Sequence, residues 1–257
     1  MRIATWNVNS LKARLDKVVA WLPSRDVDVL LMQETKLADE AVPHMEFRAL
    51  GYEVAHHGEG RWNGVAIASR VGIDAVSHGF TGAGPDADGA RFIAATCGGV
   101  RVISVYAPNG RALGTEFYDA KLAWYERLRA WLDANADPAG ALVLGGDMNV
   151  APEDVDVWDP TAFEYTTHTS EPERAAFARL LDWGLVDGYR VHHPEPAKYS
   201  WWDYRAGHFH KGFGMRIDHL LVTQSVVARS TGAEIDREAR KNPTPSDHAP
   251  VWIDLRD

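Results

Sequence analysis

Acidic and amide side chains that could take part in catalysis occur in two short segments. Glu34 follows an apolar run, and Asp147 and Asn149 lie within the segment GDMN. A carboxylate at a strand end is suited to a hard divalent cation, which prefers oxygen ligands. A second carboxylate can accept a proton from water, and a neighbouring amide can orient that water. In an extended chain the spacing of two places Asp147 and Asn149 on one face. The alternatives are a solvated loop glutamate and an ordinary turn that closes a strand.

Asp218 and His248 form the second candidate group. Asp218 begins an otherwise apolar strand, and burying a charge without a partner is costly. A histidine is the expected partner, because the carboxylate would fix its tautomer and favour its protonated form. A serine-hydrolase triad built on Ser246 or Ser10 is the competing interpretation, but the sequence has no G-x-S-x-G motif.

Two further blocks suit an anionic, aromatic-binding substrate. Tyr106 and Asn109 end a predicted strand and enter a turn, and both side chains can donate hydrogen bonds to a phosphate oxygen. The alternative is a packed tyrosine beside an ordinary Pro-Asn-Gly turn. Trp201 and Trp202 open a stretch rich in aromatic and basic residues, a composition suited to stacking on nucleic acid. One tryptophan of the pair is expected in the core.

The elements that must position these side chains alternate between helices and strands along the chain. Asn7, Glu34, Tyr106 and Asp147 each stand at or just after the end of a predicted strand. Because sites in layered α/β folds collect at strand ends and in the loops that follow, these residues are expected to converge. Strands are predicted over 3–6, 27–32, 52–55, 65–69, 91–96, 100–106, 141–144, 217–222 and 251–255, and helices after Ser10, after Thr115 to about 135, and after a Ser170–Glu173 capping box.

The composition indicates one domain over residues 1–257, without a linker, repeat or membrane-spanning apolar run. Cys97 is the single cysteine, which excludes an intramolecular disulfide and favours the reducing cytoplasm. The net charge of −9 counts against nucleic-acid binding, although local arginines and lysines can still meet phosphates while acidic residues hold cations.

The blocks together resemble the exodeoxyribonuclease III and abasic-site endonuclease family, within the wider endonuclease/exonuclease/phosphatase superfamily. GD-x-N and SDH occur across that superfamily, whereas QETK, Y-x-PNG, WWDY and GMRID point to this branch. The resemblance implies a four-layer α/β sandwich, in which two mixed sheets pack together with helices outside. The matching segments follow one order along the whole chain: TWNVNSLKAR, LMQETK, GVAIAS, YAPNG, GGDMNVAPED, SEPER, LLDWGLVD, YSWWDYR, GMRIDHLL and PSDHAPVW.

By motif position, the resemblance also assigns roles to individual residues. Glu34 would be the principal Mg²⁺ ligand, with Asn7 and Asp247 near the metal, and Mn²⁺ could substitute for Mg²⁺. Asp147 would activate the attacking water and Asn149 would orient it.

The other implied roles concern the substrate. His248, held by Asp218, would contact the scissile phosphate, which Tyr106 and Asn109 would also bind. The substrate-binding residues would further include Trp201 and Met215, which line a pocket for a base-free sugar, and Arg216. Whether Asp147 or His248 is the general base stays open, and His168 has no assigned role.

The implied activity is DNA repair in the base-excision pathway: cleavage on the 5′ side of abasic sites and 3′-to-5′ exonuclease or 3′-end cleaning on duplex DNA, by a monomer without membrane contact. Two alternatives remain. One is a superfamily relative that acts on another phosphoester, and the other is a binding module without catalysis, which would have no need to bury Asp218 against His248.

Overall fold

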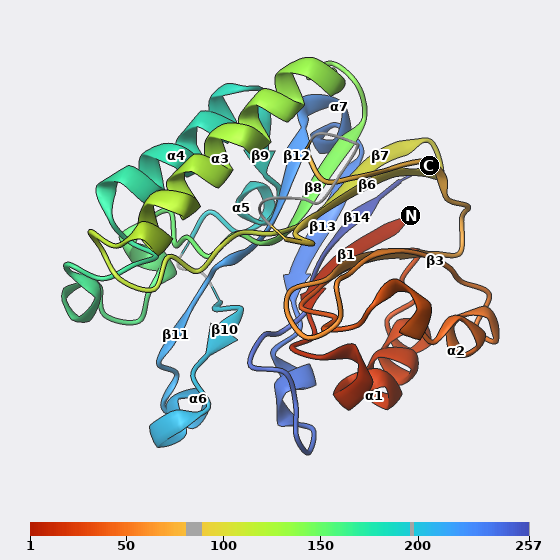
Figure 1. The fold of residues 1–257 in the computed structure, drawn as a ribbon, viewed down its shortest axis with the longest axis horizontal. Helices are drawn as coiled ribbons and strands as arrows, with labels where there is room; N and C mark the ends of the chain where they lie inside the picture. The colour runs from red at the N-terminus through yellow and green to blue at the C-terminus, as the bar shows by residue number, and fades with distance from the viewer. Residues whose placement is uncertain (81–88, 196–197, 257) are drawn as a thin grey trace.

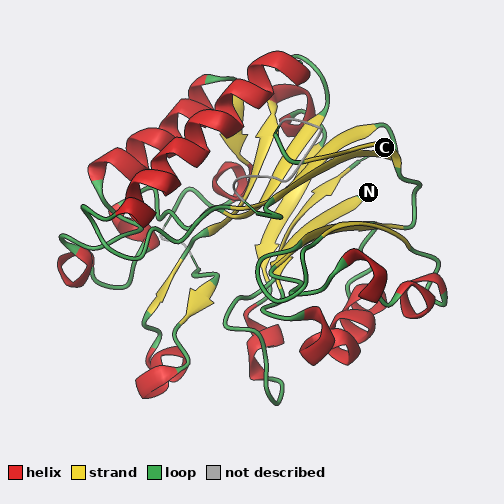
Figure 2. Ribbon diagram, viewed as in Figure 1, coloured by secondary structure: helices red, strands yellow, loops and turns green. Residues whose placement is uncertain are grey.

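The structure is a computed structural model that describes residues 1–80, 89–195 and 198–256. Two six-stranded sheets lie at its centre between two groups of helices (Figures 1 and 2). The first sheet has the order β13 (Ser230–Ile235), β14 (Val251–Leu255), β1 (Arg2–Asn7), β2 (Val29–Gln33), β4 (Val65–Ser69) and β3 (Glu53–His57). The second has the order β5 (Asp74–His78), β6 (Phe92–Cys97), β7 (Val100–Tyr106), β8 (Leu142–Asp147), β12 (Asp218–Thr223) and β9 (Leu185–Asp187).

Each sheet contains one parallel pair among antiparallel ones, so both are mixed. The parallel pairs are β1 with β2 and β7 with β8. Side chains of β2 alternate between the two faces: Leu31 packs into the core between the sheets, while Leu30 and Met32 pack against the outer helices. This confirms the predicted sandwich of two packed mixed sheets flanked by helices, and it explains the continuous apolar sequence of β2.

Helices cover the outer face of each sheet. Helices α1 (Leu11–Ser24) and α2 (His44–Arg48) cover the first, and α3 (Glu116–Asn135) and α4 (Glu171–Asp182) cover the second (Figure 1). The smaller elements are α5 (Gly188–His192), α6 (His208–Lys211), α7 (Gln224–Val227), the ribbon of β10 (Trp201–Trp202) with β11 (Gly214–Met215), and 3₁₀ turns at Asp39–Ala41, Asp154–Asp156, Pro160–Phe163, Arg205–Gly207 and Arg237–Lys241. Within the described ranges, no helix has the length and apolar character needed to cross a bilayer.

Local capping chemistry sets the starts of the long helices. The Ser10 hydroxyl accepts from the backbone N–H of Ala13, and Thr115 caps α3. Ser170 and Glu173 form the predicted capping box of α4. Pro23 lies inside the last turn of α1. A proline there is tolerated because its ring disturbs only the final turn.

The predicted site residues lie at the end of the sandwich where the strands of both parallel pairs, β1 with β2 and β7 with β8, finish. In β7 and β8, Tyr106 lies opposite Asp147, and Asp218, at the start of antiparallel β12, is the other neighbour of Asp147. In the first sheet, Asn7 is the last residue of β1 and lies beside Gln33, the last residue of β2, which directly precedes Glu34. Since the two sheets pack face to face, the predicted strand-end residues are brought to one end of the core.

Candidate active site

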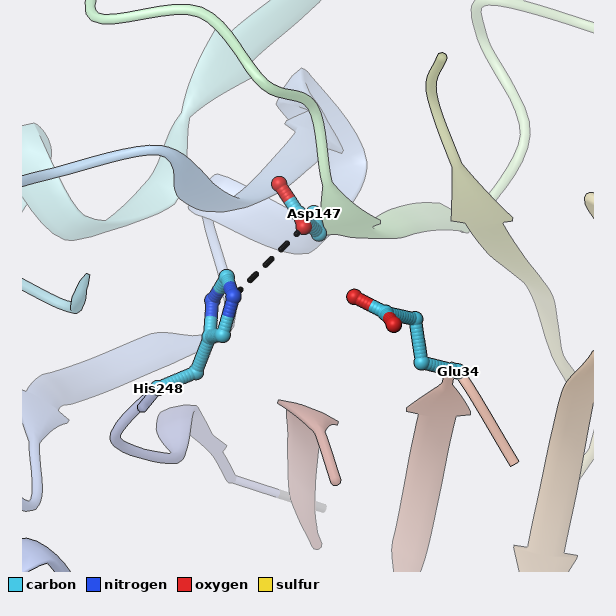
Figure 3. A group of neighbouring side chains, drawn as sticks. All are labelled: Glu34, Asp147 and His248. Carbon is cyan, nitrogen blue, oxygen red and sulfur yellow. Dashed lines mark ion pairs between the residues drawn. The ribbon is translucent and has the colours of Figure 1, made fainter. Parts of the chain in front are cut away.

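Glu34, Asp147 and His248 form the centre of the site. They come from the ends of β2 and β8 and from the loop before β14, and their ligand-type atoms all lie within 4.8 Å of one another (Figure 3). The Asn7 side-chain amide joins two of them, because its Nδ2 donates to Glu34 Oε1 at 2.8 Å and to Asp147 Oδ2 at 2.9 Å. Asp147 and His248 are buried and Glu34 is half-buried, so the cluster is open to solvent on the Glu34 side.

His248 is held by Asp218, as the sequence predicted. His248 Nδ1 lies 2.8 Å from Asp218 Oδ2, and its Nε2 faces Asp147 Oδ2 at 3.7 Å. The Ser200 hydroxyl donates to Asp218 Oδ2 at 2.6 Å and fixes the carboxylate from the other side. Ser246, the alternative nucleophile, is buried and donates to the backbone carbonyl of Asn7, so it is not available for a hydrolase triad.

The electrostatics of the cluster displace two pKa values. Burial, followed by the charges of Asp218 and Glu34, raises the pKa of Asp147 to about 7, although His248 opposes this shift. Burial alone would lower the pKa of His248, but the carboxylates of Asp218 and Asp147 raise it to about 10. At neutral pH the imidazole is therefore protonated, while Asp147 can exchange a proton with solvent.

Tyr106, Asn109, Asn149 and His168 form the rim of the site next to Asp147. Burial, with the charges of Glu34 and Asp147, raises the pKa of Tyr106 well above its ordinary value, so the phenol remains a hydrogen-bond donor. Asn109 Nδ2 lies 3.3 Å from Asn149 Oδ1 and 3.4 Å from His168 Nε2. The Tyr106 phenol and the Asn109 amide are thus donors beside the acidic cluster, while Asn149 Oδ1 and His168 Nε2 accept from Asn109.

The expectation that Asp147 and Asn149 share a face of an extended chain was wrong. Asn149 has a left-handed backbone with φ of 50°, and its N–H donates to Asp147 Oδ1 at 2.9 Å. The backbone thus forms the Asx turn that was the alternative, and the Asn149 amide donates to the carbonyl of Ala107. The turn still leaves both side chains in the site.

Asp247 is linked to the acidic centre through the side chains of other residues. Its carboxylate accepts from Asn9 Nδ2 at 2.9 Å and from Trp201 Nε1 at 3.1 Å. Asn9 Oδ1 in turn accepts from Lys36 Nζ, which pairs with Glu34 at 2.9 Å. Asp247 therefore connects to Glu34 through Asn9 and Lys36.

Trp201 and Met215 face each other across the β10–β11 ribbon and line a cavity of about 340 Å³. Trp158, Phe213 and His168 line the same cavity. Trp202, the other member of the pair, is buried, which confirms that one tryptophan belongs to the core. The cavity adjoins the catalytic cluster through His168, which contacts Asn149, and through Trp201, which contacts Asp247.

Arg216 is not brought to the site, contrary to the sequence-based expectation of a substrate-binding role. Its side chain is buried and donates to Asp156 at 2.7 Å and to Asp187 at 2.6 Å. A buried, doubly paired guanidinium is not free to bind a substrate, so we assign Arg216 a structural role beneath the pocket.

Several residues at the site were missed from the sequence. Asn9 and Lys36 stand within the matched NVNS and QETK segments, two residues after Asn7 and Glu34, and their position was the available signal. His168 had no such signal. Its Nδ1 donates to the Asn149 carbonyl at 2.7 Å, and burial together with the Lys121 ammonium lowers the pKa of His168 to about 4. The ring is therefore neutral at pH 7.

Comparison with known proteins gives the class of this chain. Residues 4–248 match the Endonuclease/Exonuclease/phosphatase family, and the chain belongs to that family. It is 35% identical to exodeoxyribonuclease III of Haemophilus influenzae over the full length of both chains. A solved AP endonuclease from Archaeoglobus fulgidus shares 37% identity, and a 3′ phosphatase from Neisseria bound to a product DNA hairpin shares 40%. Both structures superpose over the full length of both chains, with TM-scores of 0.96 and 0.95 respectively.

Proposed function

We propose that this protein is a DNA repair nuclease that hydrolyses phosphodiester bonds with a divalent cation, on the 5′ side of abasic sites and at 3′ ends of duplex DNA. The observation that carries the proposal is the group of Glu34, Asp147 and His248, with Asp218 behind the imidazole. Hydrolysis of an anionic diester needs an activated water, a cation and donors for the developing charge. The named relatives, an exodeoxyribonuclease III, an AP endonuclease and a DNA-bound 3′ phosphatase, support the same activity.

In this proposal Asp147 is the general base. A pKa of about 7 suits a group that accepts a proton from water at neutral pH, whereas His248, with a pKa of about 10, already carries its proton. The His248 imidazolium would donate to a non-bridging oxygen of the scissile phosphate and stabilise its added negative charge. Asp218 would keep Nδ1 protonated and the ring in place.

Tyr106, Asn109 and Asn149 would hold the phosphate and the water. The phenol and the Asn109 amide are donors beside Asp147, and Asn149, whose backbone N–H donates to Asp147 Oδ1, would orient a water for this carboxylate. Such fixed donors lower the barrier because they need little reorganisation when charge develops.

The oxygen donors of the cluster fit a hard cation. Glu34 supplies carboxylate oxygens, which Mg²⁺ and Mn²⁺ prefer, whereas a protonated His248 cannot act as a ligand. We assign Glu34 as the principal ligand, with Asn7 beside it and Asp247 in the surrounding shell through Asn9 and Lys36. The cation would neutralise charge on the phosphate and bring it within reach of the water.

The substrate is proposed to be duplex DNA bound by a monomer in the cytoplasm, with residues 1–257 as one domain. The cavity beside Trp201 and Met215 would receive the sugar of an abasic nucleotide, because an unstacked sugar without a base is easily turned out of the helix. The apolar and aromatic lining suits the sugar's carbon face.

The experiment that tests the proposal uses three labelled duplexes, with an internal abasic site, a recessed 3′ end or a 3′-phosphate, each with Mg²⁺, with Mn²⁺ or with excess chelator. The expected result is cleavage with either metal and none with chelator. Full activity in chelator would exclude the metal-dependent mechanism. Cleavage of a small phosphomonoester or lipid phosphodiester but of none of the duplexes would favour the superfamily alternative, and DNA binding without any cleavage would favour a binding module.

A further inference from the structure

Lys121 on α3 and Glu173 on α4 form a buried ion pair that the proposed mechanism does not use. Lys121 Nζ lies 2.5 Å from Glu173 Oε1, and both side chains are 0% exposed. A buried pair of this kind adds little net stability, since desolvation of the two charges offsets their attraction. Its place in the molecule therefore needs another explanation.

The other acceptors around Lys121 belong to the active site. Its Nζ donates to the backbone carbonyl of Asn149 at 2.7 Å and lies 3.3 Å from that of Asn109. These two residues carry the amides that face the reacting phosphate in the proposed function. One ammonium group thus ties the loop after β7 to the loop after β8.

Glu173 attaches a third loop to the same point. Its Oε1 accepts from the Thr167 hydroxyl at 2.7 Å and from the His168 backbone N–H at 3.0 Å. Its Oε2 accepts from the Ser170 hydroxyl at 2.5 Å, which completes the cap of α4. The Thr167 hydroxyl also contacts the carbonyl of Asn109 at 2.9 Å. Three of the four rim residues, Asn109, Asn149 and His168, are therefore bonded to this pair through their backbones.

A second ion pair joins the same two helices and provides a comparison. Glu126 on α3 and Arg179 on α4 approach to 2.5 Å, but this pair is exposed and touches no active-site loop. Holding α3 against α4 therefore does not require the buried pair, especially since their apolar faces share one core cluster.

We propose that Lys121 and Glu173 are positioning residues, which set the placement of Asn109, Asn149 and His168 relative to Asp147. The inference rests on the proposed function, because it assumes that the two asparagine amides act on the substrate phosphate. Small displacements of such groups are costly: a misplacement of about 1 Å can reduce a rate about a hundredfold.

The test compares Lys121→Met with the double variant Lys121→Met/Glu173→Gln. The single variant leaves a buried carboxylate without its cation, so its melting temperature should fall clearly. The double variant removes both charges, and glutamine keeps the cap of α4, so most of the lost melting temperature should return. Because neither variant restores the bonds to the two asparagine carbonyls, kcat should remain about tenfold or more below wild type in both, with little change in KM.

The matched control is Glu126→Gln/Arg179→Met, which removes the exposed pair between the same helices. Its kcat should stay within about twofold of wild type. A double variant of the buried pair that regains wild-type kcat together with its melting temperature would overturn the proposal, because the pair would then act through stability alone. If the buried variants do not fold, Thr167→Val removes one bond to the Asn109 carbonyl without changing charge. It should lower kcat about threefold, and an unchanged kcat would overturn the proposal equally.

Two substrates keep this test separate from the proposed function. Each variant is assayed on an abasic duplex and on bis(4-nitrophenyl) phosphate, a small phosphodiester. A wild-type protein that hydrolyses the small diester but no DNA would refute the proposed substrate, while the variants would still report on positioning.

Discussion

Two buried clusters of charge lie on either side of β12, and they differ in how well their charges are matched. The first contains Glu34, Asp147 and Asp218 around the single imidazole of His248. The second, beneath the pocket, surrounds Arg216 with two carboxylates. Both clusters are built from groups that are costly to bury, yet only the first has the character of a catalytic centre.

In the Arg216 cluster each of the two carboxylates, Asp156 and Asp187, is paired with a guanidinium group. Asp156 accepts from Arg216 and from Arg190, and Asp187 accepts from Arg216 at 2.6 Å. Burial alone would raise the pKa of Asp187, but the Arg216 guanidinium lowers it well below its usual range. The ionised form of Asp187 is thus favoured, so this carboxylate does not exchange a proton near neutral pH.

The Asp147 cluster is the opposite case, because Asp147 and Asp218 share one histidine, while Lys36 pairs with Glu34. Burial, together with the charges of Asp218 and Glu34, raises the pKa of Asp147 to about 7, into the range where a group can both take and release a proton. The comparison teaches that burial alone does not mark a catalytic residue. An unmatched buried charge does, because its unfavourable environment is what a cation, a proton or a substrate can relieve.

The largest expected effect is on stability, from breaking the matched cluster. Arg216→Met leaves Asp156 and Asp187 buried without their main cation, so we expect the free energy of unfolding to fall by about 3–5 kcal/mol. Urea denaturation at pH 7 measures this, with Arg179→Met, in an exposed pair, as the control. An unchanged midpoint with weakened DNA affinity would restore Arg216 to the substrate-binding role that the sequence suggested.

A substitution in the Asp147 cluster should have the reverse effect: it should lower activity without lowering stability. Asp147→Asn should lower kcat by about a hundredfold or more, because the proposed base is lost. The folded-state pKa of about 7 exceeds the ordinary value of 3.8, so ionised Asp147 destabilises the fold progressively as the pH rises above about 4 and fully above about 7. With metal removed, the variant should therefore melt higher than wild type at pH 8 and similarly at pH 4. A fall in kcat of less than about tenfold would exclude Asp147 as the base.

A smaller effect is expected at the border of the catalytic cluster. Trp201→Ala removes a cavity wall and a hydrogen bond to Asp247, and should slow abasic-site incision about tenfold while removal of a 3′-phosphate changes less. The control is the buried neighbour: Trp202→Ala should cost about 3–5 kcal/mol of stability. A Trp201→Ala protein with normal melting and wild-type incision would refute the pocket assignment.

The smallest effect is the acid dependence of the matched cluster. Since the pKa of Asp187 is depressed in the folded protein, its contribution to stability is complete above the unfolded value near 3.9 and is lost as the pH falls below it. The contribution of Asp187, measured as the stability difference between wild type and Asp187→Asn, should therefore stay constant from pH 8 to pH 5 and shrink below about pH 4. Unfolding curves across this range measure it. A difference that already shrinks between pH 7 and pH 6 would mean that a histidine, such as His219, controls the cluster.

The sequence alone determined the kinds of residue at the site and the elements that carry them. The apolar run before Glu34, the block that ends in Asp147 and the apolar strand that begins with Asp218 are local patterns. Local patterns predict strands because side-chain periodicity and burial act over a few residues. The same holds for the caps at Ser10, Thr115 and Ser170, which depend on residues at most three positions away. The order of the motifs then implied the sandwich that the structure has.

Only the tertiary structure decided which of these residues touch. Asn7 bridges Glu34 and Asp147, although 140 positions separate Asn7 from Asp147. Lys121 on α3 contacts both the Asn149 carbonyl and Glu173 on α4. The resemblance placed Arg216 at the substrate. In the structure, alternation along the chain turns its side chain away from that of Met215, toward Asp156 and Asp187. Whether a buried charge is matched depends on partners supplied by distant strands and helices. For that reason the difference between a structural and a catalytic cluster exists only once the two sheets have packed together.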